Sequence, residues 1–278
     1  PQPGNDDLII GGMQDNGSWR TQSQNFGNAW DEVLGGDGGF AAIVPGANTF
    51  YVSAQLGFVV RTQRAGGVFR QSVVSPALTD DNFLFITPYV LDPANTNVMY
   101  MAVRNAVWRN SDLSAIPLNN VEPTNTNWAR LSNSAVSPQA SVTALAVPKQ
   151  PANRLYFGAT NFQSNTVIIQ VDNAQTNPAG VNITPPEITK GSYPSSIAIN
   201  PGNPDELIVT FSNYNIPSVF HSNNGGATWT DVEGNLAGRE GPSVRWAVIL
   251  PDEGYYLATS TGVYSTSLLN ESNTTWVL

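Results

Sequence analysis

Two aspartates in glycine-rich segments are the residues best suited to hydrolyse a glycosidic bond. Asp15 is followed by Asn-Gly, and Asp37 has glycine on both sides. Glycoside hydrolysis usually uses two carboxyl groups roughly 5–10 Å apart, one of them protonated. Asp15 and Asp37 are therefore the candidate catalytic pair. The same segments are ordinary turn sequences, in which aspartate caps backbone N–H groups, and we favour this structural interpretation.

Aromatic and polar residues lie close to these aspartates in the sequence. Carbohydrate sites combine aromatic faces with amide and carboxylate groups, and the chain has 7 Trp and 9 Tyr. If the two turns converge on one face, they would form a polar pocket edged by aromatic rings. Its ligand-binding residues would be Asp15, Asn16, Trp19, Arg20, Trp30 and Asp37. Packing in the core is the alternative, and more usual, role of the aromatic residues.

Other kinds of catalysis are excluded or disfavoured. The chain has no cysteine, which excludes disulfides, zinc–thiolate sites and thiol nucleophiles. No Gly-x-Ser-x-Gly segment accompanies the single histidine, so a serine hydrolase is not expected. We expect this residue, His221, to pack or hydrogen-bond within its own repeat unit. The arginines are scattered, whereas a sialidase needs a cluster of them to hold the substrate carboxylate.

No cofactor is expected, but the oxygen ligands leave a structural calcium ion open. Asp6-Asp7, Asp80-Asp81 and the turn at Asp37 offer carboxylates, which suit calcium better than zinc. None of these segments has the spacing of an EF-hand loop. The metal content is therefore not predicted.

Composition and charge limit the classes of partner. The chain has 278 residues, of which 41 % are hydrophobic and 12 % charged, and its net charge is −9. Nucleic acids and anionic lipids are not expected as partners, because both bind basic patches. No apolar run is long enough to span a membrane as a helix. The low charge and the abundance of Asn and Thr favour a secreted or cell-surface protein. Because the chain begins at Pro1, we expect it to be a fragment of a larger protein.

A short apolar element recurs six times along the chain. Its second residue falls at positions 9, 51, 100, 156, 208 and 256, at intervals of 42, 49, 56, 52 and 48 residues. A second strand follows each copy, most copies have a strand upstream, and several units close with a Trp-containing strand. These closing strands are expected at Trp128, Trp229–Val232 and Trp276–Leu278. Four short strands in each unit of this length predict an all-β fold, a β-propeller of about six four-stranded blades. The alternative is a two-domain β-sandwich.

The repeat also predicts how the domain is organised. The approximate blades are residues 1–38, 39–82, 83–135, 136–190, 191–240 and 241–278, which together form a single propeller or most of one. The chain opens on what is normally a second strand, so the first blade lacks its innermost strand. Propellers often borrow a strand to protect exposed sheet edges. We therefore expect the missing strand, or further blades, to come from the remainder of the parent protein.

One segment resembles a known repeat. Residues 222–229, Ser-Asn-Asn-Gly-Gly-Ala-Thr-Trp, resemble the Asp-box (BNR) hairpin, with Asn224 in place of the usual aspartate. A more divergent copy spans residues 62–69. The resemblance implies a hairpin between the third and fourth strands of a blade, in which the residues that match the Asp-box pattern have a structural role. These residues are Ser222, Asn224, Gly226, Thr228 and Trp229.

The N-terminal part is similar to the sortilin/VPS10-like and BNR-repeat propellers of large secreted bacterial proteins. The similarity rests on residues 11–19, Trp30 and residues 35–40. Members of this group include glycosidases, sialidases and binding propellers, so the resemblance implies a propeller without deciding its activity.

The prediction for function is a secreted or cell-surface propeller that acts as a binding or scaffold module. Its ligands would be glycans or proteins. The first alternative is a glycoside hydrolase of BNR-repeat type that uses Asp15 and Asp37. The second is a structural or assembly propeller completed by another chain segment.

Overall fold

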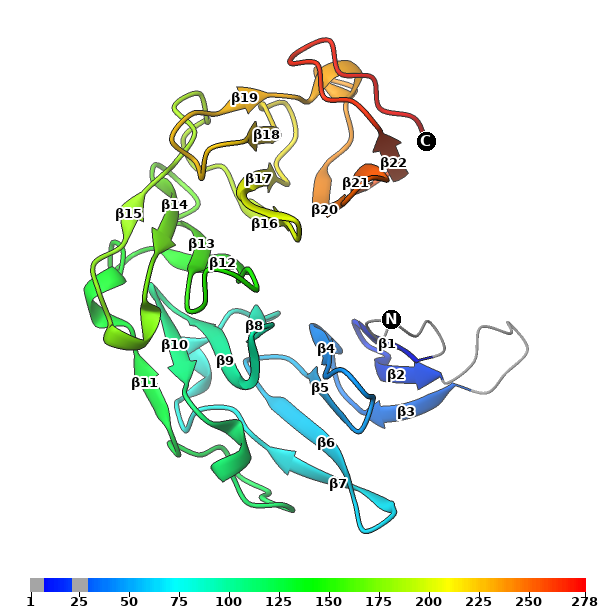
Figure 1. Cartoon of the computed structure of the whole chain (residues 1–278), viewed down its shortest axis with the longest axis vertical. Coiled ribbons are helices and arrows are strands. Elements are labelled where there is room, and N and C mark those ends of the chain that lie inside the picture. The colour runs from blue at the N-terminus through cyan, green and yellow to red at the C-terminus, as the bar shows by residue number, and fades with distance from the viewer. Residues whose placement is uncertain (1–7, 22–29) are drawn as a thin grey trace. The chain divides into compact units, whose positions relative to one another are not determined.

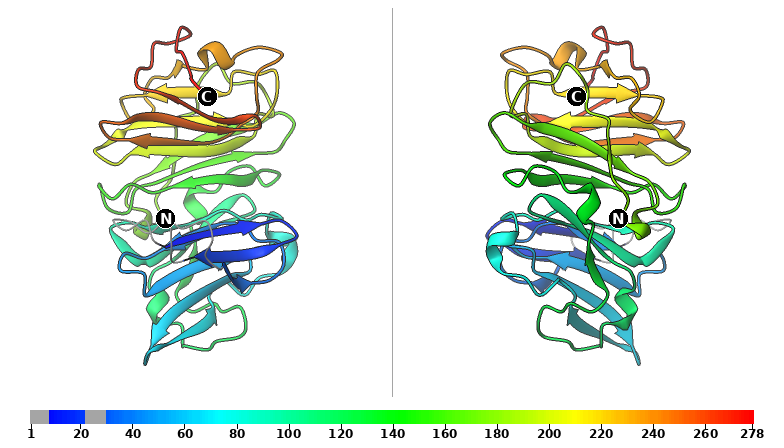
Figure 2. Two further views of the ribbon diagram at one scale, coloured as in Figure 1. Left: turned by 90° about the vertical axis from the view of Figure 1, so that its right-hand side faces the viewer. Right: turned by 90° about the vertical axis from the view of Figure 1, so that its left-hand side faces the viewer.

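The computed structural model describes residues 8–21 and 30–278 of the chain. In these residues the backbone forms six antiparallel sheets, numbered 1 to 6 in chain order, and no α-helix (Figures 1 and 2). Internal contacts divide the chain into two compact units, with sheets 1 and 2 and most of sheet 3 in the first and sheets 4 to 6 in the second. Unit 1 is Pro1–Leu91, Asn95–Val103 and Trp108–Arg130, and unit 2 is Asp92–Ala94, Arg104–Val107 and Leu131–Leu278.

The strands of unit 1 follow one another as antiparallel neighbours. Sheet 1 contains β1 (Ile9–Met13), β2 (Gly17–Thr21) and β3 (Asp31–Leu34). Sheet 2 contains β4 (Ala41–Ile43), β5 (Thr49–Ser53), β6 (Val59–Ala65) and β7 (Val68–Val73). Sheet 3 contains β8 (Tyr89–Asp92), β9 (Asn95–Val103), β10 (Ala106–Asn110) and β11 (Trp128–Arg130).

Unit 2 repeats the same succession. Sheet 4 contains β12 (Ser141–Ala146), β13 (Leu155–Thr160), β14 (Thr166–Val171) and β15 (Val181–Asn182). Sheet 5 contains β16 (Pro194–Asn200), β17 (Asn203–Phe211), β18 (Val219–Ser222) and β19 (Thr230–Asp231). Sheet 6 contains β20 (Val244–Leu250), β21 (Gly254–Thr259) and β22 (Gly262–Thr266). Short 3-10 helices in both units are η1 (Asp80–Asn82), η2 (Leu113–Ala115), η3 (Ser132–Ser134), η4 (Ala174–Thr176) and η5 (Gly234–Leu236).

The six repeated apolar elements of the sequence occupy equivalent strands. They lie in β1, β5, β9, β13, β17 and β21, the second strand of each four-stranded sheet. Phe50, Tyr156 and Ile208 in these strands have no exposed surface. Both faces of such a strand are covered, which explains why its sequence is continuously apolar rather than alternating.

The first and last sheets have three strands each in the described residues. In sheet 1, β1 pairs with β2 and occupies the position of a second strand. In sheet 6, the fourth strand predicted at Trp276–Leu278 is replaced by an isolated bridge between Ser265 and Val277. The side chain of Asn235 in η5 accepts from the N–H of Trp276 at 2.7 Å and donates to the carbonyl of Trp276 at 3.0 Å. Val277 still pairs with Ser265 of β22 through two reciprocal backbone hydrogen bonds of 2.8 and 2.9 Å, so the predicted strand is reduced to one paired residue.

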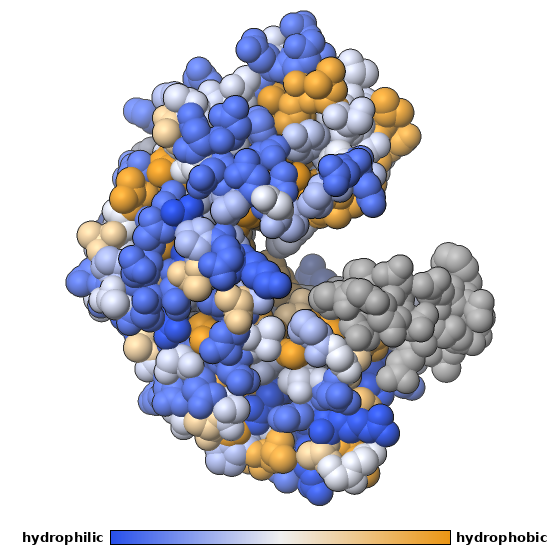
Figure 3. All heavy atoms as spheres, viewed as in Figure 1, coloured by the Kyte–Doolittle hydropathy of each residue, from blue (hydrophilic) through white to orange (hydrophobic). Residues whose placement is uncertain are grey.

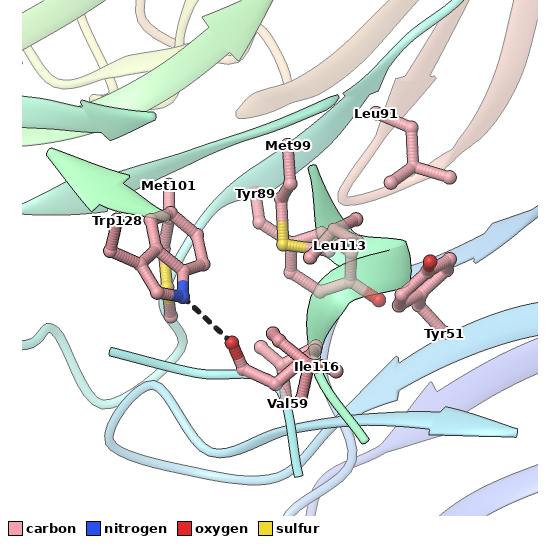
Figure 4. Close-up of a cluster of buried hydrophobic side chains, with 10 residues drawn as sticks. Tyr51, Val59, Tyr89, Leu91, Met99, Met101, Leu113, Ile116 and Trp128 are labelled. Carbon is pink, nitrogen blue, oxygen red and sulfur yellow. Dashed lines mark hydrogen bonds between the residues drawn. The ribbon is translucent and has the colours of Figure 1, made fainter. Parts of the chain in front are cut away.

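Each unit has two apolar clusters that join neighbouring sheets. In unit 1, Tyr51 and Val59 of sheet 2 pack with Met99, Met101 and Trp128 of sheet 3 (Figure 4). A smaller cluster joins sheets 1 and 2. In unit 2, one cluster lies between sheets 4 and 5 and another between sheets 5 and 6. The core of each unit is therefore a series of layers between successive sheets.

A tryptophan hydrogen bond reinforces several of these layers. In each case the indole N–H of one sheet donates to the carbonyl of the residue that directly follows the fourth strand of the preceding sheet. The pairs are Trp128 with Val74 (2.8 Å, Figure 4), Trp229 with Ile183 (2.6 Å) and Trp276 with Val232 (2.9 Å). Between sheets 1 and 2 the amide of Gln71 makes a corresponding bond to Val33 (2.8 Å). A side-chain N–H donor thus recurs at the same position of the repeat and binds a backbone carbonyl of the preceding sheet.

Candidate functional site

The two glycine-rich segments of the N-terminal region meet in the structure. The backbone N–H of Asp15 donates to Oδ1 of Asp37 at 2.8 Å, and that of Gly38 donates to the carbonyl of Met13 at 3.0 Å. The approach requires glycine, because a Cβ on Gly12 would lie 2.4 Å from the backbone nitrogen of Gly39. The segment that follows β3 therefore lies directly against the β1–β2 hairpin.

The same contacts give Asp37 a structural role. One of its carboxylate oxygens accepts the Asp15 bond, while its own N–H donates to Oε1 of Gln55 at 2.9 Å. Asp15 has a φ of 61°, a value that aspartate tolerates at a tight turn. The carboxylate of Asp37 thus caps the β1–β2 turn, as the structural interpretation of the sequence requires.

Trp19 and Arg20 lie on opposite faces of sheet 1, because successive strand residues point to opposite sides. Trp19 lines an apolar cavity of about 390 Å³ with Ile9, Met13 and Trp30, and its Nε1 donates to the carbonyl of Asn16 at 2.5 Å. Arg20 faces sheet 2. The six predicted ligand-binding residues are therefore divided among two faces and one turn, and they do not line a single pocket.

The cavity that includes Arg20 is lined by charged, polar and aromatic residues, unlike the apolar cavity on the other face of sheet 1. Its volume is about 540 Å³, and we call it the Arg20 pocket. The guanidinium carbon of Arg20 lies 4.6 Å from the ring centroid of Phe69 and 5.5 Å from that of Phe50, within the range of cation–π attraction. Asp31 lies 3.7 Å from Nη2 of the same side chain. The lining also includes Glu32, Val33, Thr62, Val68, Arg70, Gln71 and Asn119.

Polar atoms of the Arg20 pocket lack partners. Nε and Nη1 of Arg20 and Oγ1 of Thr62 are buried, and none has a hydrogen-bond partner among the described residues. Thr62 is 4 % exposed. A buried polar group without a partner costs about 1–3 kcal/mol, so a ligand that brought an oxygen atom within reach of these groups would recover part of that cost.

Sequence reasoning identified Arg20 but missed the aromatic rings beside it. Phe50 belongs to the apolar repeat, where burial in the core is expected. Phe69 is the aromatic residue at the end of the divergent hairpin at residues 62–69, and it is 37 % exposed. Its place in β7, at the edge of sheet 2, was the available signal that it could border a pocket.

A structural neighbour agrees with this architecture. No family model and no curated protein matches the chain. The crystal structure of the GH74 enzyme of Niastella koreensis, a propeller, matches 98 % of this chain and 52 % of that chain, with a TM-score of 0.51 and 16 % sequence identity. The chain folds as a β-propeller. It spans about half the length of that neighbour, and each of the six sheets is one blade.

The predicted Asp-box residues form a network of hydrogen bonds in the fifth blade. Oδ1 of Asn224 accepts from the N–H of Thr228 at 2.9 Å, and its Nδ2 donates to the hydroxyl of Thr228 at 2.8 Å. Oγ of Ser222 accepts from the N–H of Gly226 at 2.9 Å, and Gly226 has a φ of 87°. Asparagine thus supplies the acceptor oxygen expected of aspartate. The hairpin joins β18 to β19, and all of these contacts are structural.

His221 also has a structural environment, which confirms the expectation from sequence. Oε1 of Glu206 accepts from the hydroxyl of Tyr255 at 2.7 Å and lies 3.2 Å from Nε2 of His221, while Oε2 accepts from Asn200 at 2.6 Å. Burial alone would raise the pKa of Glu206, but these three hydrogen bonds lower it below its usual range. Burial and the bond to Glu206 raise the pKa of Tyr255 to about 12.

This network is expected to make stability pH-dependent at both extremes. Glu206 has a lowered pKa in the folded state, so its contribution is present at neutral pH and is lost as pH falls through that pKa. Tyr255 has a raised pKa, so its contribution is complete below pH 10 and is lost as pH rises from 10 towards 12.

The variant Tyr255→Phe tests the alkaline part of this dependence. It is expected to cost about 1 kcal/mol at neutral pH, the usual value of one hydrogen bond. The difference from the parent should shrink between pH 10 and about 12. Urea denaturation across this range measures both. Tyr264→Phe, whose hydroxyl contacts Thr261 at the surface, is the control and should show neither effect. A constant difference at every pH would contradict the prediction.

The candidate metal ligands and membrane-spanning segments can be compared with the described residues. Asp6 and Asp7 lie outside the described residues, and Asp80 and Asp81 lie in η1. Across residues 8–21 and 30–278, no group of three or more His, Asp or Glu side chains is arranged to hold a metal ion. In the same ranges, no helix has the length and apolar character needed to cross a membrane.

Proposed function

We propose that this propeller is a carbohydrate-binding module of a secreted or cell-surface protein, and that the Arg20 pocket is its binding site. The observation that carries the proposal is the combination of one exposed aromatic ring, that of Phe69, an arginine with unpartnered donors and a carboxylate in one cavity. Sugars are bound by such mixed sites, since their hydroxyls need polar partners and their C–H faces pack on aromatic rings. The structural neighbour, a glycoside hydrolase, supports a carbohydrate ligand.

Binding accounts for the geometry better than hydrolysis does. The carboxylate of Asp37 caps a turn through the Asp15 N–H, so it is already engaged in holding the backbone. In the Arg20 pocket, Asp31 and Glu32 are successive residues of β3 and point to opposite faces. A Cβ on Gly17 would lie 2.8 Å from Oε1 of Glu32, which places that carboxylate beside the β1–β2 hairpin. The pocket therefore offers one carboxylate where hydrolysis uses two.

A glycan array containing neutral and acidic oligosaccharides tests the proposal, followed by calorimetric titration of the strongest binder. Arg20→Met is expected to weaken binding by roughly 10-fold or more, because charge-assisted hydrogen bonds contribute about 1.5–3 kcal/mol. Arg109→Met is the matched control, since Arg109 lies over the ring of Tyr100 at 5.8 Å but does not line the pocket. It should bind within about twofold of the parent.

Two results would overturn the proposal. The first is the absence of binding to any glycan, and the second is equal loss in the two arginine variants. Glycoside hydrolysis is the second candidate, which the neighbour favours. Release of reducing ends by the parent, abolished in both Asp15→Asn and Asp37→Asn, would establish hydrolysis in place of simple binding.

A further inference from the structure

Sheet 6 has one covered apolar face and one uncovered apolar face. Ala247, Ile249 and Leu257 belong to the cluster shared with sheet 5. On the other side of the strands, Val248 and Val263 are 39 % and 60 % exposed. In the view of Figure 3, hydrophilic residues are interspersed with hydrophobic patches, and sheet 6 adds an apolar face that is open to solvent. Such faces are typical of interaction surfaces.

The fifth blade shows what covers this face in the repeat. In sheet 5, Ala198 pairs with Ile208 across β16 and β17, and in sheet 6 the equivalent pair is Val248 and Tyr256. Ala198 and Ile208 are 8 % and 0 % exposed because sheet 6 packs on them. The uncovered face of sheet 6 is therefore the face that, one repeat earlier, receives the next sheet.

In sheet 1 the uncovered face is the one that, in later blades, packs on the preceding sheet. Ile10 and Val33 pack in the cluster shared with sheet 2. On the other side, Met13, Trp19 and Trp30 line the apolar cavity described above, and Met13 is 49 % exposed. In sheets 5 and 6 the corresponding side packs on the preceding sheet. Sheet 1 thus presents the side of a blade that the uncovered face of sheet 6 would receive.

We propose that these two faces dock between copies of the chain, with sheet 6 of one copy packing on sheet 1 of a second copy. The contact would repeat the packing that already joins sheet 5 to sheet 6. It is a head-to-tail contact, because two different surfaces meet, and the assembly as a whole keeps one free sheet 1 face at one end and one free sheet 6 face at the other. The proposal does not depend on carbohydrate binding, since the Arg20 pocket lies on the other face of sheet 1.

Complementary blocking variants test the proposal. Val248→Lys combined with Val263→Lys places charges on the sheet 6 face, and Met13→Lys places one on the sheet 1 face. Light scattering coupled to size-exclusion chromatography measures mass over a series of concentrations up to about 100 µM, where contacts of micromolar affinity are populated. The parent is expected to associate, and each blocked protein is expected to be a monomer. An equimolar mixture should give a dimer, because each variant retains the face that the other has lost.

Val121→Lys is the matched control, because Val121 is 74 % exposed and belongs to neither face. It should associate as the parent does, and circular dichroism should show that all variants remain folded. A parent that is monomeric at every concentration, blocked variants that still associate alone, or a mixture that stays monomeric would each overturn the proposal.

Discussion

Replacement of Trp128 by alanine is expected to lower the free energy of unfolding by about 3–5 kcal/mol. Trp128 is 8 % exposed and packs in the cluster between sheets 2 and 3. The substitution removes its ring from that cluster and also leaves the carbonyl of Val74 without its donor. The packing and the hydrogen bond both join sheets 2 and 3, so losing both lowers the free energy of unfolding more than losing either one.

Two further variants separate these contributions in urea denaturation. Trp128→Phe keeps most of the apolar packing and removes the indole donor, so it should cost about 1–3 kcal/mol, the penalty of an unsatisfied buried carbonyl. Trp30→Ala, measured in dilute solution, is the control, because Trp30 is 46 % exposed. A surface substitution of this kind should stay within about 0.5 kcal/mol. Equal losses for Trp30 and Trp128 would contradict the layered core.

Adding one methyl group to Gly12 is expected to destabilise the N-terminal blade by about 1–3 kcal/mol or more. A Cβ at this position would lie 2.4 Å from both the nitrogen and the carbonyl oxygen of Gly39. These are backbone atoms, so the strain cannot be relieved by turning a side chain. The segment after β3 would have to move away from the β1–β2 hairpin, which would also separate Asp15 from Asp37.

The adjacent residue supplies the control for this experiment. A Cβ on Gly11 would have no atom within 4 Å. Gly11→Ala should therefore change the free energy of unfolding by no more than about 0.5 kcal/mol. Urea denaturation of the two variants compares the same chemical change at neighbouring positions of β1. Similar effects at both positions would show that the close approach of the loop does not constrain the blade.

The repeat could be predicted from sequence because its physical cause is local. Strands such as β5 and β17 contain continuous apolar runs, Phe50–Val52 and Leu207–Val209, since these residues are covered on both faces, and the spacing of the runs is visible in the chain. The end of the last blade could not be predicted in the same way. Trp276–Leu278 has the composition of a strand, and Val277 does pair with Ser265 of β22, but the neighbouring N–H and carbonyl of Trp276 bind the side chain of Asn235, which is far away in sequence.

The candidate site was predicted only in part for a related reason. The meeting of the turns that hold Asp15 and Asp37 was a condition of the predicted pocket, whereas the side of the sheet on which each neighbour would lie was not specified. Adjacent positions such as Trp19 and Arg20 must separate once they enter a strand. The partners of Arg20 are Phe50 and Phe69 from another sheet, and only the three-dimensional packing brings them together.

The tryptophan link between sheets has a consequence for how such a chain can change over evolutionary time. Its donor is one side chain, but its acceptor is a main-chain oxygen, which every amino acid carries. A mutation at Val74, Ile183 or Val232 leaves that oxygen in place. Successive blades can therefore drift apart in sequence while the attachment between them persists, as expected for a chain whose repeats share spacing more than identity.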